Sequence, residues 1–367
     1  MRNLTRQEVE DLIWGCTVLG TGGGGNPAEP LEVLPRYLEE GKAIKLAGLD
    51  DVPDDAFVAT PYGCGGVEPV EGDGCTFEVE VDELYQAFVG LEAHTGKSCF
   101  GAMSIEIGGG NTAAAIAVAA LRGIPIIDAD PAGRSVPGVE HTTFFVHGVP
   151  IEPMAIATAK GDLVIIEKVA DDFRAEEVAR AISVTNYSHC GIADHMVDGK
   201  TLKRTVIHGA LSYAMGIGRA IREAREQGKD PVEAAIAAGD GYRLFAGAVS
   251  AAKTHNADGF TFGDIEIRGA EAFDGDRFRI WYKNENIMSW HNDAVDVTVP
   301  DLICVLDRRT GEPITNPHCT PGMDVVVVGY RSPAEWRTPR GMLSFGPKSF
   351  GHDIEYKEIE SLTRLAS

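Results

Sequence analysis

Clusters of glycine in the first part of the chain limit its fold more than any other sequence feature. Four consecutive glycines follow Thr21, and further glycine-containing segments lie at 63–66, 108–110 and 128–134. Glycine adopts positive φ angles and lets a ligand or another part of the chain approach its backbone closely. Single glycines commonly mark turns. Ordinary turns do not need three or four in a row, so the set predicts loops that meet at one pocket, with compact turns as the alternative.

Regular elements are expected between these clusters. Thr5 and Glu8 form a capping box, and apolar residues at helical spacing continue from there to Leu19. A second helix is expected from Pro27, and Asn111 is the expected N-cap of an alanine-rich helix. Strands are expected at 56–60, 98–107 and 123–127, and helices at 82–91 and 112–121. This order of strand, glycine loop, helix and strand predicts a parallel sheet.

The pattern changes towards the C-terminus. Strands are expected at 142–146 and 163–166, and helices at 175–183, 211–227 and 232–238. After Tyr242 the chain consists of short β-type segments separated by turn signals. A chain of 367 residues exceeds one typical core, so two domains are expected. We predict an α/β N-terminal domain with a parallel sheet and Gly-rich loops over 1–165, and a helical segment followed by a β-rich C-terminal domain over 166–367.

Composition excludes several classes of function. The formal net charge of −22 argues against nucleic acid and anionic membrane surfaces as partners, because both are bound through clustered Lys and Arg. No apolar segment is long enough to span a bilayer, and the N-terminus does not resemble a signal peptide. Seven irregularly spaced cysteines favour reduced thiols in a cytoplasm. A cytoplasmic protein that acts on a small molecule is expected; its oligomeric state stays open, with a homo-oligomer among the possibilities.

The first glycine cluster contains the pattern G-x-G-x-x-G at residues 20–25. In a dinucleotide-binding fold this pattern connects a strand to a helix. Here it is expected between two helices, which argues against an NAD site of that kind. A loop that leads into a helix N-terminus can still bind an anion through free N–H groups.

Two acidic residues follow the apolar segment that ends at Ile127. Asp128 and Asp130 are two positions apart, so on a strand their side chains would share one face. Ligands bind at the carboxyl ends of parallel strands, which favours a catalytic role for both. The alternative is an Asx turn made by one of them. Arg134 is expected to hold an anionic group of the substrate or to pair with these carboxylates.

Further candidates lie at the glycine loops. Glu68 and Glu106 are candidate catalytic acids or bases, although each could equally be a solvated surface carboxylate. Close backbone approach or side-chain polarity makes the following residues candidates for substrate binding: Gly22, Gly23, Gly24, Cys64 and Asn111.

Histidine and cysteine gather at one place in the sequence. His189, Cys190 and His195 lie within eight residues, and His208 follows. Imidazoles and thiolates are ligands that Zn²⁺ prefers, and a catalytic zinc needs three of them and one open position. The spacing matches no standard zinc motif. A divalent metal, most simply zinc, is therefore one interpretation, and a surface loop with titrating histidines is the other. A nucleophilic thiol at Cys190 or Cys64 is a further alternative.

Several segments together resemble a known bacterial family. They are residues 15–25, 106–111, 126–134, 300–303 and 345–351. These segments are similar to motifs of the S-methyl thiohydantoin desulfurase family, and they extend over nearly the whole chain. One departure follows Arg134: the family usually has Pro-Glu, whereas here Pro137 precedes Gly138, and Glu140 could take the place of the glutamate.

The resemblance implies a function as well as a fold. It implies an α/β domain followed by a β-rich domain, and metal-dependent hydrolytic removal of sulfur from a thiohydantoin or S-methyl thiohydantoin ring to give a hydantoin. It also implies a place in the degradation of ergothioneine-like compounds. Two other functions stay open from the residues alone: a non-catalytic small-molecule binding protein, and a nucleotide- or phosphate-binding subunit of an amidohydrolase.

Overall fold

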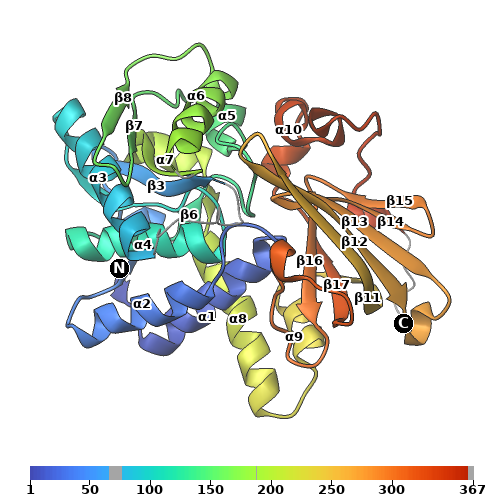
Figure 1. The fold of residues 1–367 in the computed structure, drawn as a ribbon. Helices are drawn as coiled ribbons and strands as arrows, with labels where there is room; N and C mark the ends of the chain where they lie inside the picture. The colour runs from blue at the N-terminus through green and yellow to red at the C-terminus, as the bar shows by residue number, and fades with distance from the viewer. Residues whose placement is uncertain (66–76, 187, 363–367) are drawn as a thin grey trace.

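A mixed eight-stranded sheet forms the centre of the first half of the protein (Figure 1). The structure is a computed structural model that describes residues 1–65, 77–186 and 188–362. The strands of this sheet are β1 Arg2–Asn3, β2 Lys45–Ala47, β3 Phe57–Gly65, β4 Cys99–Ala102, β5 Ile126–Ile127, β7 Met154–Ala157, β8 Leu163–Ile166 and β9 His189–Asp198. Their order is β1-β2-β5-β4-β3-β9-β7-β8. Strands β2, β5, β4 and β3 are parallel, and the others pair antiparallel.

Helices cover both faces of this sheet. They are α1 Arg6–Leu19, α2 Ala28–Glu39, α3 Phe77–Thr95, α4 Gly109–Arg122, α5 Thr143–His147, α6 Asp172–Thr185 and α7 Gly199–Thr205. Side chains alternate across the sheet, as the pleat of a strand requires. Ile126 packs with residues of α1, α3 and α4, whereas Ile127 packs with residues of α5 and α7 on the opposite face. The first half is therefore a three-layer α/β/α arrangement.

The second half begins with two helices and continues as an antiparallel sheet. The helices are α8 Ala210–Glu226 and α9 Pro231–Ala238. The strands are β11 Tyr242–Ala257, β12 Phe260–Gly269, β13 Arg277–Lys283, β14 Glu285–His291, β15 Ala294–Thr298, β16 Leu302–Asp307 and β17 Asp324–Tyr330. Their order is β15-β14-β13-β12-β11-β17-β16. Leu12 of α1, Leu211 of α8 and Val328 of β17 belong to one buried cluster, so these helices lie between the two sheets.

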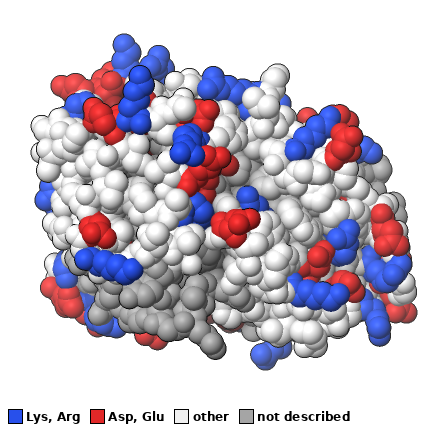
Figure 2. Space-filling model, turned by 45° about the horizontal axis from the view of Figure 1, so that its top comes forward, with Lys and Arg blue, Asp and Glu red and all other residues white. Residues whose placement is uncertain are grey.

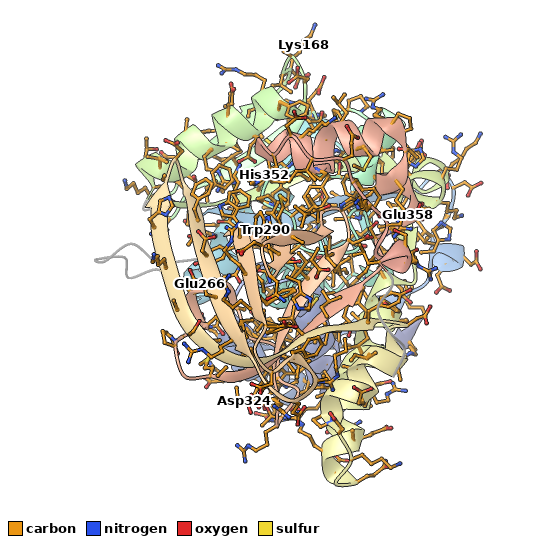
Figure 3. All side chains as sticks on the ribbon, turned by 90° about the vertical axis from the view of Figure 1, so that its right-hand side faces the viewer. Lys168, Glu266, Trp290, Asp324, His352 and Glu358 are labelled. Carbon is orange, nitrogen blue, oxygen red and sulfur yellow. The ribbon has the colours of Figure 1, made fainter. Side chains whose placement is uncertain are left out.

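Short elements complete the chain. A two-stranded ribbon pairs β6 Ala129–Asp130 with β10 Ile207–His208. One more helix is α10 Pro339–Phe345, and 3-10 helices lie at Leu49–Asp51, Glu271–Phe273, Asn316–His318, Ala334–Arg337, Pro347–Phe350 and Ile359–Ser361. The C-terminal segment returns across the second sheet, where His352 lies over Trp290 (Figure 3), with 6.3 Å between ring centroids.

Most of the predicted elements are present, with two corrections. The capping box is formed, because the amide of Glu8 donates to Thr5 Oγ1 and the amide of Thr5 donates to Glu8 Oε2. Helix α4 begins at Gly109, so Asn111 lies in its first turn and is not its N-cap. The strand predicted at 142–146 is wrong. Thr142 caps a single helical turn there, and this local hydrogen bond outweighs the β propensity of the segment.

The predicted fold class is confirmed: an α/β N-terminal domain is followed by helices and a β-rich C-terminal domain. The first sheet is mixed, however, because β9 enters it antiparallel between β3 and β7. Strand β9 comes from beyond residue 166, so the first sheet draws on both sides of the predicted domain boundary. Within the described ranges, no helix combines the length and apolarity needed to cross a bilayer.

Candidate active site

The glycine loops meet at the carboxyl ends of the parallel strands. The amide of Gly110, at the start of α4, donates to the carbonyl oxygen of Gly24 over 2.7 Å. The amide of Gly63, at the end of β3, donates to Asn111 Oδ1 over 3.0 Å. We call this region the strand-end junction, and it consists of residues 21–25, 63–65, 104–111, 134–141 and 283–286.

The glycines of the first loop permit close contact with protein side chains. A Cβ atom built on each of three glycines would lie within 2.3 Å of a side chain: Asn316 for Gly22, Glu285 for Gly23 and Ser135 for Gly24. All three glycines are buried. Two of the three contacts come from the second half of the chain. We therefore assign Gly22, Gly23 and Gly24 first to the contact between the two halves of the protein, and second to the binding of a ligand.

Glu106 is a buried carboxyl group at the centre of the junction. Its Oε1 accepts a hydrogen bond from Asn111 Nδ2 and its Oε2 accepts one from the amide of Val136, each over 2.7 Å. Burial raises the pKa of Glu106 to about 7, although both hydrogen bonds oppose the change. This carboxyl group can therefore gain or lose a proton near neutral pH.

Glu285 supplies a second buried carboxyl group from the other half of the protein. It is the first residue of β14 and lies against Gly23. Its Oε2 has no hydrogen-bond partner among the described residues. Burial, and then the neighbouring charge of Glu106, raise the pKa of Glu285 well above its usual value. Burial at this position therefore favours the protonated form of Glu285.

A third carboxyl group lies at the edge of the junction. Glu140 Oε1 is 3.2 Å from His141 Nε2, and its Oε2 has no hydrogen-bond partner in the described structure. Burial, together with the charge of Glu176, raises the pKa of Glu140 to about 8. Lys283 is half-buried nearby, with its ammonium group 3.8 Å from the ring centroid of Phe260, and burial lowers its pKa. The junction thus gathers ionisable groups of both signs.

A histidine and a glutamate form a pair on the α3 side of the sheet. His189 Nδ1 lies 3.2 Å from Glu83 Oε2, and Glu83 Oε1 accepts a hydrogen bond from Asn186 Nδ2. A Cβ atom at Gly63 would lie 2.6 Å from His189 Nε2, so only glycine leaves room for this ring. A carboxylate next to an imidazole nitrogen fixes the orientation of the ring and can adapt the ring for proton transfer at its other nitrogen.

Two cysteines face each other on the α6 side of the same strands. Cys64 of β3 and Cys190 of β9 are directly opposite in the antiparallel register, and both are buried. The neighbouring Cys190 thiol, and then the charge of Arg180, lower the pKa of Cys64 even though burial opposes the change. Cys64, together with burial, raises the pKa of Cys190 well above its usual value, and the Cys190 thiol donates to the carbonyl oxygen of Ala179.

The two aspartates after β5 do not share one face. Asp128 lies between β5 and β6 and accepts a hydrogen bond from the amide of Ser212, in the first turn of α8. Asp130 is buried, and its Oδ2 accepts hydrogen bonds from the amides of Ala132 and Gly133. Burial raises the pKa of Asp130 to about 8. Because β5 ends at Ile127, the expectation of a shared strand face was wrong, and we assign both carboxyl groups to local structure.

Arg134 is a buried connection between the two halves. Its five N–H groups donate to the carbonyl oxygens of Ser135, Pro300, Asp301 and Asn286 and to Thr21 Oγ1. Its guanidinium group also lies 5.0 Å from the ring centroid of Phe345. Because every donor already has a protein acceptor, we assign Arg134 to the contact between the halves instead of to the substrate.

The predicted zinc ligands lie in different places. His189 and Cys190 are consecutive residues of β9, so their side chains lie on opposite faces of the sheet. His208 is exposed in β10, with Nε2 2.8 Å from the carbonyl oxygen of Lys203.

His195 is also separate from the others. Its buried ring stacks on Phe144, with 4.4 Å between centroids, and its Nδ1 lies 2.8 Å from Asp194 Oδ1. In the part of the chain that the structure describes, no three His, Cys, Asp or Glu side chains form a group that could hold a metal ion. The described residues therefore do not fit the zinc site that the sequence predicts, and we assign no metal ligands.

Sequence reasoning found part of the junction and missed the rest. Asn111 donates to Glu106, and Cys64 follows Gly63, whose amide donates to Asn111. Glu68 lies outside the described residues. Glu83, Lys283 and Glu285 were missed. The only sequence signal for Lys283 and Glu285 is the polar segment 283–286 between two apolar strands, which also fits an ordinary turn. Glu83 lies within the helix predicted at 82–91.

Charges of both signs are interspersed on the surface. Figure 2 shows Lys and Arg beside Asp and Glu over the face that is drawn, without one extended patch of either sign among the described residues there. Exposed pairs such as Arg174–Glu177 and Arg6–Glu10 contribute to this pattern.

Known families and structures resemble this chain over nearly its whole length. A family model described as S-Me-THD-like, N-terminal domain, matches residues 7–168, and one described as S-Me-THD-like, C-terminal domain, matches residues 170–359. A crystal structure of a protein from Chromobacterium violaceum has a TM-score of 0.80 and 20% sequence identity, and the match covers 98% of this chain and 100% of that one. At this identity the likeness shows the fold alone. No curated protein matches this chain.

Proposed function

This chain belongs to the S-Me-THD-like family, as its sequence motifs predict, and we propose that it hydrolyses the carbon–sulfur bond of a thiohydantoin or S-methyl thiohydantoin ring. The products are a hydantoin and free sulfide or methanethiol. The observation that carries the proposal is the pair of buried carboxyl groups, Glu106 and Glu285, at the strand-end junction.

Burial raises the pKa of both carboxyl groups. The pKa of Glu106 is raised to about 7, whereas that of Glu285 is raised well above its usual value. Environments that separate the pKa values of two neighbouring acids supply one base and one acid at the same pH. Hydrolysis at C2 of the ring needs both, because water must lose a proton and the departing sulfur must gain one.

Each carboxyl group suits one of the two proton transfers. Glu106, in its ionised form, accepts a proton from water as the oxygen attacks C2. Glu285 gives its proton to sulfur as the carbon–sulfur bond breaks. Asn111 Nδ2 holds Glu106 in place over 2.7 Å, and Glu285 lies against Gly23. We route no step through a metal ion, since the described residues do not assemble a ligand set.

A product assay tests the proposal. The purified protein is incubated with a thiohydantoin, its S-methyl derivative and a hydantoin in water enriched in oxygen-18. We expect stoichiometric thiol release from the sulfur compounds and one heavy oxygen atom in the hydantoin formed. Binding of the rings without thiol release would contradict the proposal and favour a binding protein.

Two matched variants assign the acid. Glu285→Gln keeps the shape of the side chain and removes the proton that it donates, so turnover should fall by on the order of 10²- to 10⁴-fold. Glu266→Gln is the control, because Glu266 is exposed on β12 of the same sheet. Equal activity of the two variants would remove Glu285 from the mechanism.

A further inference from the structure

Strand β8 is an open edge of the first sheet, and its residues are apolar on both faces. It pairs with β7 on one side, and no other strand of the described structure pairs with its other side. Leu163 packs against Gly90 of α3, whereas Ile166 packs with residues of α6 on the opposite face. Leu163 is 51% exposed and Val164 is 36% exposed. The outer edge of β8 therefore presents apolar side chains to solvent.

The hydrogen bonds of the β7–β8 hairpin show which main-chain groups of β8 point outward. The amide of Thr158, just after β7, donates to the carbonyl oxygen of Asp162, just before β8. Hydrogen-bonded and non-hydrogen-bonded pairs alternate along an antiparallel ladder. Counted from this bond, Leu163 and Ile165 belong to non-hydrogen-bonded pairs with β7. Their N–H and C=O groups therefore point away from β7 and can pair with another strand.

The other ends of the two sheets are protected against such pairing. Edge strands usually carry a charged side chain or a bulge, are very short, or are covered by another segment. Strand β1 has only two residues, β15 contains Asp296, and β16 is buried over most of its length. Strand β8, in contrast, consists of Leu163–Ile166 and has no charge, proline or bulge. An uncovered apolar edge of this kind is a template for a strand of another chain.

The charges that flank β8 favour a second copy of this chain as the partner. Two symmetric antiparallel registers, centred on Val164 or on Ile165, keep most of the strand paired. With the two-fold axis at Ile165, Asp162 of each copy is opposite Lys168 of the other, and both side chains are exposed. With the axis at Val164, Lys160 would be opposite Lys168, and like charges in this position are destabilising. The segment is therefore complementary to itself in the register centred on Ile165.

Helix α6 adds apolar surface beside this edge. It runs back alongside β8, because only residues 167–171 connect the two elements and Lys160 Nζ, in the turn before β8, donates to the carbonyl oxygen of Thr185 at the helix end. Phe173 is 41% exposed and Val184 is 55% exposed. A spacing of about three helical turns places them on one face of α6. A short strand alone buries less area than a stable dimer needs, and these side chains enlarge the apolar surface.

We propose that this protein forms a two-fold symmetric dimer in which β8 pairs antiparallel with β8 of a second copy. Ile165 and its copy exchange main-chain hydrogen bonds, so one continuous sheet extends across both copies. Val164 becomes covered, and Asp162 lies opposite Lys168, which projects from the molecule beyond the end of β8 (Figure 3). No residue of the strand-end junction belongs to this interface, so the dimer does not depend on the proposed function.

Analytical ultracentrifugation of the full chain is the first test. We expect the mass of two chains at micromolar concentration, with dissociation on dilution that gives the dimer dissociation constant. A monomer throughout the concentration series would overturn the proposal.

Two substitutions test the edge itself. Val164→Lys places a charge in the apolar contact, and Ile165→Pro removes an N–H group that points away from β7, so the ladder with β7 is kept. Because each change occurs twice in the dimer, each should raise the dissociation constant by on the order of 100-fold or more. Val295→Lys is the matched control, since Val295 is 41% exposed on β15, an edge strand of the other sheet. Thermal melting verifies that each variant folds. A dimer that both folded edge variants leave intact, or that the control weakens equally, would overturn the proposal.

Charge reversal tests the register. Asp162→Lys and Lys168→Asp each place like charges opposite each other, so each should weaken the dimer by about threefold to tenfold. The double variant restores opposite charges and should recover most of the wild-type affinity. Asp162 also accepts a hydrogen bond from Thr158 Oγ1 over 2.9 Å, so thermal melting is compared for all three variants. A folded double variant that dimerises no better than either single variant would contradict the pairing at Ile165.

Discussion

Replacement of Arg134 by methionine tests the assignment of this residue to the contact between the two halves. Methionine keeps much of the length of the side chain but removes five hydrogen bonds to buried protein acceptors. Removing one member of a buried charged network usually costs about 3–5 kcal/mol. We therefore expect a loss of about 4 kcal/mol in the free energy of unfolding.

The corresponding change in melting temperature follows from the size of the chain. An unfolding entropy of about 2.1 cal/mol/K per residue gives about 0.8 kcal/mol/K for the 367 residues. A loss of about 4 kcal/mol then lowers the melting temperature by about 5 °C. Scanning calorimetry measures this shift. Arg309→Met is the matched control, because Arg309 is exposed, and it should change stability by no more than about 0.5 kcal/mol.

The same variant separates the structural role from the role predicted by the sequence. If Arg134 mainly held an anionic group of the substrate, Arg134→Met would weaken substrate binding while the melting temperature stayed the same. That result would refute the argument from its five protein acceptors.

Three further predictions follow from the described contacts. Gly24→Ala should lower the free energy of unfolding, measured in urea, by about 2 kcal/mol more than Gly41→Ala. Both glycines have positive φ, but only at Gly24 would a Cβ atom lie 1.9 Å from Ser135 Oγ. Equal losses in the two variants would show that backbone strain alone matters. Burial raises the pKa of Asp130 to about 8 in the folded protein. The contribution of Asp130 to stability is therefore full at a pH below its pKa in the unfolded chain, and it is lost as the pH rises through its pKa in the folded protein. The urea midpoint of Asp130→Asn, relative to that of the wild type, should therefore be higher at pH 8.5 than at pH 5. The same difference between variant and wild type at both pH values would contradict the pKa shift. His208→Ala should leave turnover and metal content unchanged, because His208 is exposed and contacts the carbonyl oxygen of Lys203; a large loss of either, by activity assay or elemental analysis, would restore it as a ligand.

The fold could be predicted largely from local signals. The capping box at Thr5 and Glu8 fixed the start of α1, and glycine clusters separated the elements of the first sheet. The failure at 142–146 has a local cause as well. Its β-branched and aromatic residues favour a strand, but the hydrogen bond from the amide of Phe145 to Thr142 Oγ1 stabilises a helical turn.

The candidate site was less predictable because its main contacts join distant segments. Glu285 reaches Gly23 from the second half of the chain, and no local pattern indicates that contact. The predicted zinc ligands do not come together among the described residues for a related reason. His189 and Cys190 were treated as neighbours in a loop, whereas a strand sends consecutive side chains to opposite faces.

The family motifs have a structural meaning that the sequence did not provide. Arg134, from the motif at 126–134, donates to the carbonyl oxygens of Pro300 and Asp301, from the motif at 300–303. Its guanidinium group also lies over Phe345, from the motif at 345–351. Three segments that resemble the family therefore meet at one buried arginine, which explains their joint presence by packing alone.

The location of the active site is the central claim, and a crystal structure with bound hydantoin tests it most directly. We predict electron density for the ring at the strand-end junction, with C2 within reach of Glu106 and Glu285. Density for the ring at another place, with an unchanged and empty junction, would contradict the account.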